Sequence, residues 1–349
     1  MHAFRLLAWK SDGALVDVEV PRAGPGDVVI RVGGAGACHS DLHLMHEFEE
    51  GLVPWGPPFT LGHENAGWVH EIGAGVEGLE PGQAVAVYGP WGCGRCARCL
   101  AGVETYCLDV MNAPVPGGGG GLGLDGGMAE FMLVRDAQRH LLPLPEGLEP
   151  AAAAPLTDAG LTPYHAIRRS RHLLTPGSHC VVIGVGGLGG MAVQLLKATT
   201  ATTVIAVDTN ADALATAGDY GADVLIESDE GAAEAIRAAM GGRGAEVVID
   251  NVGADVTLAL AAAVVDVLGD LTIVGIGGGT LPVSFFSLPY EASVQTTYWG
   301  SRGELAEVLN LAARGLITPT VTTYPLAEAG RAYEELAAGK VRGRAVIVP

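Results

Sequence analysis

The sequence predicts an α/β protein with two domains, one β-rich and the other built on a parallel sheet. At 349 residues the chain has room for about two domains, each with a sizeable core. Up to residue 150, short β-type runs are separated by glycine and proline. From about residue 151 onward, Ala-rich helical segments alternate with buried strands. Such alternation indicates a parallel sheet with helices on both faces.

The first half contains four main β-type runs, at residues 28–34, 67–73, 84–89 and 128–134. Between the third and the fourth run lies a cysteine-rich stretch, followed by the glycine-rich segment 117–127. This segment follows no strand and precedes no obvious helix, so we expect a mobile loop there rather than a phosphate-binding turn.

The second half contains five apolar runs that are typical of strands, at residues 179–185, 202–208, 222–228, 246–253 and 271–277. The most apolar long region, 258–279, is interrupted by Asp266 and Asp270, so we expect a buried helix and strand there and no membrane span. A helical segment at 303–315 leads to a terminal strand at 344–349.

The composition excludes several classes of partner. The formal net charge is −19, from 39 acidic and 20 basic residues, which opposes binding to nucleic acid and to anionic membranes. Hydrophobic residues make up 49% of the chain, which indicates a globular rather than a disordered protein. The N-terminal stretch has too short an apolar core for a signal peptide, so we expect a cytoplasmic protein.

Four cysteines within a short stretch form a candidate metal site. Cys93, Cys96, Cys99 and Cys107 are separated by two, two and seven residues. Thiolates at this spacing can surround one tetrahedral zinc ion, which would be closed and structural. Two disulfides or an unliganded redox loop are the alternatives, but nothing marks the chain as secreted and cytosolic thiols stay reduced.

A glycine-rich turn indicates a dinucleotide-binding fold of the Rossmann type. Gly184, Gly186 and Gly189 fit the pattern G-x-G-x-x-G, and a strand precedes them while a helical run follows. Together with Gly187 and Leu188 they would place the pyrophosphate at the start of that helix. The alternative is a glycine turn in an α/β domain without a ligand.

The next strand ends in Asp208, which is placed to accept hydrogen bonds from both adenosine ribose hydroxyls. Neither Thr209 nor Asn210 supplies a cation for a 2′-phosphate, so the sequence favours NAD over NADP.

Further motifs give the chain a family resemblance. Cys38 lies in ACHSDLH, His63 and Glu64 lie in GHE, and Asp158 lies in TDAGLTPYHA. With the cysteine stretch, GVGGLG followed by Asp208, YWGSR and RGRAVIVP, these residues make the chain resemble the zinc-dependent medium-chain alcohol dehydrogenases over essentially its whole length. It is particularly similar to bacterial NAD-dependent secondary alcohol dehydrogenases such as that of Rhodococcus ruber.

The resemblance implies the domain plan. A GroES-like, β-rich catalytic domain would comprise residues 1–157 and 298–349, with a structural zinc lobe at 89–110. A Rossmann domain with a doubly wound parallel sheet would comprise residues 158–297 and bind NAD.

The resemblance also implies a catalytic zinc held by Cys38, His63 and Asp158. Many family members have cysteine at the third position, but a carboxylate is an acceptable zinc ligand and the similar bacterial subgroup has aspartate too. A helix N-cap is the alternative for Asp158. Glu64 would lie behind the metal and could exchange with water as a ligand. Asp41 would hydrogen-bond the ligand histidine, unless it is an ordinary turn carboxylate.

In this family, zinc lowers the pKa of a bound alcohol, and hydride moves from the resulting alkoxide to the nicotinamide. Ser40 matches a hydroxyl that relays the proton, with a helix cap as its alternative. His43 matches a histidine that passes the proton to solvent in some members, or it shapes the substrate pocket.

Several cofactor contacts follow from the resemblance. His39 and Arg344 match positions near the cofactor phosphates, although a salt bridge is the alternative for Arg344. The nicotinamide side of the site would comprise Thr162, Val274, Ile276, Thr297 and Trp299.

The substrate pocket is expected to be apolar, because zinc supplies the polar anchor. Its candidate walls are Trp55, Gly89, Ile276, Phe286, Tyr298 and Trp299. Several family members have a bulky aromatic residue where this chain has Gly89, so we expect room for a second substituent on the carbinol carbon. This favours secondary alcohols and ketones over ethanol-like substrates. The sequence shows no pair of carboxylates placed to bind the hydroxyls of a polyol, which argues against a sugar alcohol as substrate.

Two other functions remain open from the sequence. A zinc-free enone or quinone reductase of the same superfamily would lack the zinc ligands, and a non-catalytic dinucleotide-binding protein would not need Ser40. The family resemblance implies a homodimer or homotetramer formed through the cofactor domain, where the apolar stretch 285–294 could pair across a two-fold axis.

Overall fold

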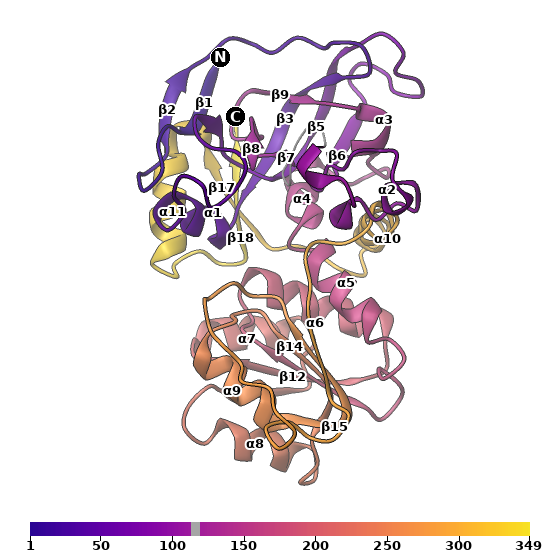
Figure 1. Ribbon diagram of the computed structural model, residues 1–349, viewed down its shortest axis with the longest axis vertical. Coiled ribbons are helices and arrows are strands. Elements are labelled where there is room, and N and C mark those ends of the chain that lie inside the picture. The colour runs from indigo at the N-terminus through magenta and orange to yellow at the C-terminus, as the bar shows by residue number, and fades with distance from the viewer. Residues whose placement is uncertain (113–118) are drawn as a thin grey trace. The chain divides into compact units, whose positions relative to one another are not determined.

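The computed structural model describes residues 1–112 and 119–349, which form two compact units. The first unit comprises Met1–Leu161, Trp299–Arg314 and Pro319–Pro349, and the second comprises Thr162–Tyr298 and Gly315–Thr318 (Figure 1). The two units are defined by which residues pack together. The boundaries predicted for the catalytic and NAD-binding domains, at 157/158 and 297/298, stay predictions.

The first unit is built on a seven-stranded sheet. Six strands follow one another in the order β10 (Leu141–Pro143), β6 (Ala84–Val87), β5 (Glu64–Ile72), β3 (Val28–Ala37), β18 (Arg344–Val348) and β17 (Val321–Pro325), and β9 (Phe131–Val134) also pairs with β3. All neighbours are antiparallel except β17 and β18. The central strand β3 is buried at nine of its ten positions, which the apolar and glycine-rich sequence VVIRVGGAGA permits.

Smaller elements complete this unit. A three-stranded sheet has the order β2 (Ala14–Asp17), β1 (His2–Leu6) and β4 (Phe59–Thr60), and β7 (Gly119–Gly120) pairs with β8 (Gly123–Leu124). Its helices are α1 (His39–His46), α2 (Ala97–Leu100), α3 (Ala137–His140), α4 (Pro150–Ala153), α10 (Arg302–Ala313) and α11 (Ala329–Ala337), with the 3-10 turns η1 (Glu104–Tyr106), η2 (Val110–Asn112), η3 (Ala154–Thr157) and η4 (Leu326–Glu328). The apolar faces of β3, β5, β6, β18 and α11 meet in one hydrophobic core.

The second unit is a parallel α/β sheet with helices packed along it (Figure 1). Its strands have the order β13 (Val224–Glu227), β12 (Thr203–Asp208), β11 (His179–Ile183), β14 (Ala245–Asp250), β15 (Val265–Ile273) and β16 (Ser293–Thr296), all parallel. The helices are α5 (Leu161–Arg169), α6 (Gly187–Thr199), α7 (Ala211–Asp219), α8 (Ala232–Ala239) and α9 (Asp255–Val264).

This strand order confirms the predicted doubly wound sheet. The chain moves outward from β11 to β13, returns to β14 on the other side, and moves outward again to β16. The carboxyl ends of β11 and β14 therefore meet at a switch point, where Ile183 and Asp250 are in register. Ligands of doubly wound sheets bind at such a point. The apolar region 258–279 comprises most of α9, all of β15 and the residues that follow, so it contains the expected helix and strand.

The glycine-rich segment differs from the prediction of a mobile loop wherever the structure describes it. Its backbone N–H groups at Gly126 and Gly127 donate to the carbonyls of Thr60 and Gly62. A Cβ on Gly121 would lie 2.5 Å from the carbonyl of Gly62, so glycine is required by close backbone packing. Gly119–Gly127 is thus packed against the segment that carries His63, and residues 117 and 118 lie outside the described residues.

Among the helices that the structure describes, all are too short or too polar to span a bilayer.

Candidate metal and cofactor sites

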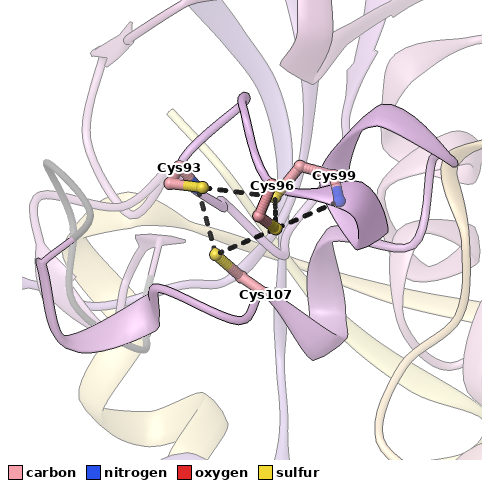
Figure 2. Close-up of side chains that lie close together, drawn as sticks. All are labelled: Cys93, Cys96, Cys99 and Cys107. Atoms are coloured by element: carbon pink, nitrogen blue, oxygen red, sulfur yellow. Dashed lines mark hydrogen bonds between the residues drawn. The ribbon is translucent and has the colours of Figure 1, made fainter.

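The four cysteines of the lobe point their sulfurs toward one another (Figure 2). The Sγ atoms of Cys96 and Cys99 are 3.4 Å apart, those of Cys93 and Cys99 3.9 Å, and those of Cys96 and Cys107 4.0 Å. A disulfide needs about 2.05 Å, whereas zinc–sulfur bonds of about 2.3 Å place tetrahedral ligands about 3.8 Å apart. All four cysteines are free, so the disulfide alternative is wrong and the arrangement fits a structural zinc.

Backbone hydrogen bonds prepare this lobe for a cation. The Cys96 sulfur accepts the N–H groups of Cys99 at 3.4 Å and Leu108 at 3.5 Å, which lowers the pKa of this thiol to about 6. The Cys107 sulfur accepts two more, from Cys93 and Asp109. Burial acts in the opposite sense on Cys99, whose thiol pKa it raises to about 12. The thiolate form of Cys96 is therefore favoured, and this is the form that binds metal.

A buried ion cluster attaches the lobe to the rest of the first unit. Glu104, in η1, accepts the Nε–H of Arg139 at 3.1 Å and a second N–H from the same guanidinium. His140 lies 3.5 Å from the other oxygen of this carboxylate, and its ring stacks on Trp91. Burial would raise the pKa of Glu104, but His140 and Arg139 together bring it below its ordinary value.

The second metal cluster joins four side chains from three separate segments of the first unit. Cys38 is the N-cap of α1, His63 precedes β5, Glu64 begins β5, and Asp158 follows η3. Their ligand atoms all lie within 4.8 Å of one another, with His63 Nε2 at 3.5 Å from Asp158 Oδ2. Cys38, His63 and Glu64 are buried, while Asp158 is partly accessible. The structure thus brings together the predicted ligands.

The Asp41 carboxylate sets the direction of His63. One of its oxygens lies 3.0 Å from His63 Nδ1, while the other accepts the Cys38 N–H at 3.0 Å and the Tyr333 hydroxyl at 2.8 Å. Because Nδ1 is engaged, Nε2 is the nitrogen left for the cluster, and ligand histidines are commonly oriented in this way. Asp41 is completely buried within α1 and is therefore not an ordinary turn carboxylate.

Tyr333 is a member of the site that the sequence analysis missed. It lies on α11, 292 residues after Asp41, and in the sequence it has the spacing of a core residue in an amphipathic helix. Burial and then the charge of Asp41 raise the pKa of Tyr333 far above its ordinary value, so its hydroxyl remains a donor.

The negative groups of the cluster favour a positive charge at its centre. Burial alone would lower the pKa of His63, but Asp41, Asp158 and Cys38 oppose this, and the net pKa lies well above its ordinary value. A metal cation can supply this positive charge in place of the proton, because it binds the neutral imidazole and displaces the proton.

Glu64 is held by a buried guanidinium. Arg344 donates its Nε–H to Glu64 Oε2 at 3.0 Å and a second N–H to Oε1. Gly36 makes room for this pair, because a Cβ there would lie 1.8 Å from Oε2. The salt bridge, which was the alternative for Arg344, is therefore present. A guanidinium has further N–H groups besides the two that bind Glu64. Phosphate binding by Arg344 therefore stays a prediction. Direct metal ligation by Glu64 also stays a prediction.

The other predicted residues of the first unit are placed as follows. Cys38, not Ser40, is the N-cap of α1, so the helix-cap alternative for Ser40 is wrong. Likewise, α5 begins at Leu161, so Asp158 is not its N-cap. His43 Nδ1 lies 2.7 Å from Glu47 Oε1, and His39, the first residue of α1, is exposed.

Trp299 lies beside the metal cluster. Its ring centroid is 5.8 Å from that of His63, with the rings at 80°. A Cβ on Gly89 would lie 2.6 Å from Cζ2 of the indole, so glycine at this position admits the tryptophan side chain. Room for a substrate substituent at Gly89 stays a prediction. Trp55 packs instead among aromatic rings, 5.6 Å from Phe59 and 6.0 Å from Trp9.

The glycines of the second unit fit the backbone of a pyrophosphate site. Gly184 has φ of +76°, and a Cβ on Gly189 would lie 1.9 Å from the carbonyl oxygen of Gly184, so the turn and the close packing of α6 require glycine. A Cβ on Gly186 would meet no described atom within 4 Å and would project into space that a ligand can fill. The structure describes no side-chain cap on α6, which begins at Gly187, so its first N–H groups are available to phosphate.

Asp208 is anchored next to this turn. Its Oδ2 accepts the N–H of Val185 at 2.7 Å and its Oδ1 that of Asn210 at 2.9 Å. A carboxylate can accept further hydrogen bonds from ribose hydroxyls. Asp208 belongs to the end of β12, next to the switch-point strand β11.

The remaining candidates of the second unit follow β15 and β16 or begin α5. The Val274 N–H donates to the Asp250 carbonyl, and the Thr297 N–H donates to the Ile273 carbonyl. The Thr297 hydroxyl is buried and has no hydrogen-bond partner among the described residues, and the contact of this residue with the nicotinamide stays a prediction. Thr162 is buried in α5, whereas the side chains of Ile276, Phe286 and Tyr298 are exposed.

Comparison with known families identifies both halves of the chain. Residues 24–146 match the alcohol dehydrogenase GroES-like domain, and residues 187–314 match the zinc-binding dehydrogenase family.

Relatives match over the whole length. An NAD-dependent alcohol dehydrogenase of Sulfolobus acidocaldarius is 35% identical over 344 residues, which covers 95% of each chain. The crystal structure of an alcohol dehydrogenase from Aeropyrum pernix has a TM-score of 0.91 and 37% identity over 100% of both chains. An acetophenone reductase of Geotrichum candidum, solved in complex with NAD, has a TM-score of 0.86 and 31% identity, and covers 100% of this chain and 97% of that one.

The fold and the two metal clusters are therefore those of a zinc-type dehydrogenase with a GroES-like and a Rossmann-like domain. The chain belongs to the zinc-dependent medium-chain alcohol dehydrogenases, a family of oxidoreductase enzymes.

Replacing Cys99 with serine should remove one ligand of the lobe and leave three thiolates. We expect loss of one equivalent of bound zinc and a lower folding yield or midpoint of thermal unfolding, because structural zinc contributes folding energy. Metal analysis and thermal unfolding measure this, with Cys180→Ala, outside both clusters, as the control. A variant with unchanged zinc content and unfolding midpoint contradicts the structural zinc.

Replacing Tyr333 with phenylalanine removes one donor to Asp41 and leaves the ligands intact. We expect affinity for the second zinc to fall about tenfold, because groups that orient a ligand have effects of that size. Competition with a chelator measures the affinity, and the lobe zinc serves as an internal reference. Tyr324→Phe is the matched control, because its hydroxyl donates to Glu335 instead. Equal zinc affinity in both variants would mean that the Tyr333 hydroxyl does not support the site.

Proposed function

We propose that this protein is an NAD-linked, zinc-dependent alcohol dehydrogenase that interconverts secondary alcohols and ketones, and also accepts some primary alcohols and aldehydes. The observation that carries the proposal is the buried cluster in which Cys38, His63 and Asp158 converge and Asp41 orients the histidine. This donor set of sulfur, nitrogen and oxygen is suited to a catalytic zinc with a position left for substrate.

In this proposal Cys38, His63 and Asp158 hold the catalytic zinc. Bound there, the metal would supply a Lewis acid that polarises the substrate oxygen and lowers the pKa of an alcohol. Two further carboxylates have different roles in this site. Asp41 fixes the imidazole of His63 through Nδ1, and Glu64 stays paired with Arg344. Burial of Cys38 and His63 limits water near the reacting groups.

The proton path begins on α1. Ser40, two residues after the ligand Cys38, would take the proton from the substrate hydroxyl, and His43, partly accessible and hydrogen-bonded to Glu47, would carry it toward solvent. The hydrogen bond to Glu47 supports this role, because it holds the His43 ring in place on α1.

The cofactor in this proposal is NAD, with its pyrophosphate on the glycine turn and the start of α6. The open space beside Gly186, the available N–H groups of α6 and the position of Asp208 support it. The relative from Sulfolobus acidocaldarius is named NAD-dependent, and the acetophenone reductase was solved with NAD. Thr162, Val274, Ile276, Thr297 and Trp299 would surround the nicotinamide, and His39 would lie near the phosphates.

For the substrate we propose secondary alcohols and the corresponding ketones. The Trp299 indole beside His63 offers an apolar wall next to the reacting carbon. The similarity to an acetophenone reductase supports a ketone with an aromatic substituent as one substrate.

We further propose that a second copy of the chain covers the edge of the parallel sheet. β16 is the last strand in the sheet, and the chain just before it carries the exposed rings of Phe285, Phe286 and Tyr290. Phe285 contacts both of the other rings, so the three form one apolar cluster. An edge strand next to such a cluster is a site for self-association. In a cytoplasmic homodimer or homotetramer, the second copy would pair with the edge strand and cover the apolar cluster. The mass of the assembly in solution decides between dimer and tetramer.

The first test is formation of NADH from NAD with a panel of primary and secondary alcohols, before and after zinc chelation. We expect turnover of secondary alcohols that is lost on chelation. Cys38→Ser and His63→Ala should lower kcat/KM by at least about a thousandfold, because they remove metal ligands. NADH binding should persist in both variants, and Cys180→Ala should remain active.

Two outcomes would contradict this function. NADH binding without turnover of any alcohol would favour a non-catalytic protein, and reduction of enones or quinones that survives chelation would favour a zinc-free reductase.

Replacing Asp208 with alanine should weaken binding of NAD more than of NADP. The loss of hydrogen bonds between a carboxylate and the ribose should raise the KM for NAD about tenfold or more. KM values for both cofactors measure this, with Asp212→Ala as the control, because that carboxylate is exposed in the first turn of α7. An unchanged ratio of the two KM values would rule out the ribose contact.

A further inference from the structure

The orientation of Trp299 next to the catalytic cluster needs a physical cause. The indole packs edge-on against the His63 ring and occupies the space above Gly89. Its backbone has φ of +50°, in the left-handed region. A bulky residue adopts that conformation only where the neighbouring structure holds it, so the chain around Trp299 must be fixed by other groups.

Two hydroxyl groups fix the next residue. The carbonyl oxygen of Gly300 accepts the Tyr88 hydroxyl at 2.7 Å and the Thr105 hydroxyl at 2.8 Å, and the two hydroxyl oxygens are 3.2 Å apart. This carbonyl belongs to the peptide plane between Gly300 and Ser301, so the two hydroxyls hold the chain one residue after Trp299 and thereby restrict the backbone that leads from the tryptophan. Both lone pairs of the carbonyl are used, which leaves this peptide little freedom to rotate.

Tyr88 is itself rigidly held. Its side chain is fully buried, its N–H donates to the His140 carbonyl at 2.8 Å, and its carbonyl accepts the Trp91 indole N–H at 2.7 Å. Trp91 is three residues after Tyr88 in the chain, and its ring stacks on that of His140. The Tyr88 hydroxyl is therefore a fixed point to which Gly300 is attached.

The other anchor belongs to the cysteine lobe. Thr105 lies in η1, between Cys99 and Cys107, and the neighbouring Glu104 binds Arg139. The lobe makes a second contact nearby, because the Gly102 carbonyl accepts the N–H of Arg302, three residues after Trp299. The conformation of the chain at 299–302 thus depends on the lobe that the structural zinc would hold together.

We propose that Tyr88 and Thr105 are positioning residues that set the Trp299 indole against His63, so that the cysteine lobe takes part in determining which substituents on the carbinol carbon are accepted. This inference rests on the proposed function, in which Trp299 is a wall of the substrate pocket. Neither hydroxyl touches the reacting atoms. The two hydroxyls act indirectly, because the position of the Trp299 indole determines the space available to a substrate beside His63.

The test uses the full-length, zinc-loaded enzyme and the variants Thr105→Val and Tyr88→Phe, each of which removes a hydroxyl with little change in shape. The readout is the ratio of kcat/KM for 1-phenylethanol to that for 2-propanol. We expect each variant to change this ratio about fivefold, the effect of one hydrogen bond, and Trp299→Phe to change it in the same direction. NADH affinity and the content of two zinc ions should stay unchanged.

Three controls separate positioning from general destabilisation. Thr105→Ser keeps the hydroxyl and should preserve the wild-type ratio. Tyr324→Phe and Thr202→Val remove a tyrosine and a threonine hydroxyl elsewhere, from bonds to Glu335 and Ser178, and should not change it. If Thr105→Val fails to fold, Tyr88→Phe carries the test.

A second readout is independent of activity. Protein labelled with 5-fluorotryptophan gives one ¹⁹F resonance for each of its five tryptophans, and Trp299→Phe identifies the resonance of Trp299. We expect Thr105→Val and Tyr88→Phe to shift or broaden that resonance. An unchanged resonance together with an unchanged substrate ratio would overturn the inference. If the wild-type enzyme oxidises neither alcohol, the proposed function fails, and with it the claim about substituents, whatever the resonance shows.

Discussion

The catalytic cluster depends on one buried carboxylate, that of Asp41. It has no exposed surface, and it receives the Nδ1 side of His63, the N–H of Cys38 and the hydroxyl of Tyr333. A carboxylate in such a place is stable only if its oxygens are satisfied by donors, so these three groups must stay where they are. Asp41 thereby fixes two metal ligands at once and ties α1 to α11, near the opposite end of the chain.

Around this carboxylate, glycines let functional groups approach the backbone. Gly36 leaves room for the ion pair of Glu64 and Arg344, Gly89 leaves room for the Trp299 indole, and Gly121 leaves room for the Gly62 carbonyl. In each case a Cβ would overlap atoms that the site needs. In the second unit, glycine serves the same purpose at Gly189, where α6 approaches the turn after β11. The abundance of glycine in this chain is therefore partly explained by the close packing around its sites.

Motif and spacing predicted much of the candidate site. Cys38, His63, Asp158 and the four lobe cysteines were identifiable because metal ligands must be particular residue types, and the glycine turn because it requires a backbone without side chains. The same reasoning failed where it depended on neighbours distant in sequence. Residues 119–127 form a packed turn because residues 60 and 62 accept their hydrogen bonds. Ser40 and Asp158 were possible helix caps until the start of each helix was known.

The sequence by itself determined the fold class, the ligand chemistry and the character of the dinucleotide turn, because these follow from local periodicity and from which side chains can bind a metal. The tertiary structure alone decided how these groups are supported. The Tyr333 hydroxyl on Asp41, the Arg344 guanidinium on Glu64, and the hydroxyls of Tyr88 and Thr105 on the Gly300 carbonyl join residues about 200 to 290 positions apart. No local pattern marks such pairs, since each partner alone resembles an ordinary core or surface residue. The fold selects them, because a polar group that it buries must find a partner from whatever part of the chain lies beside it.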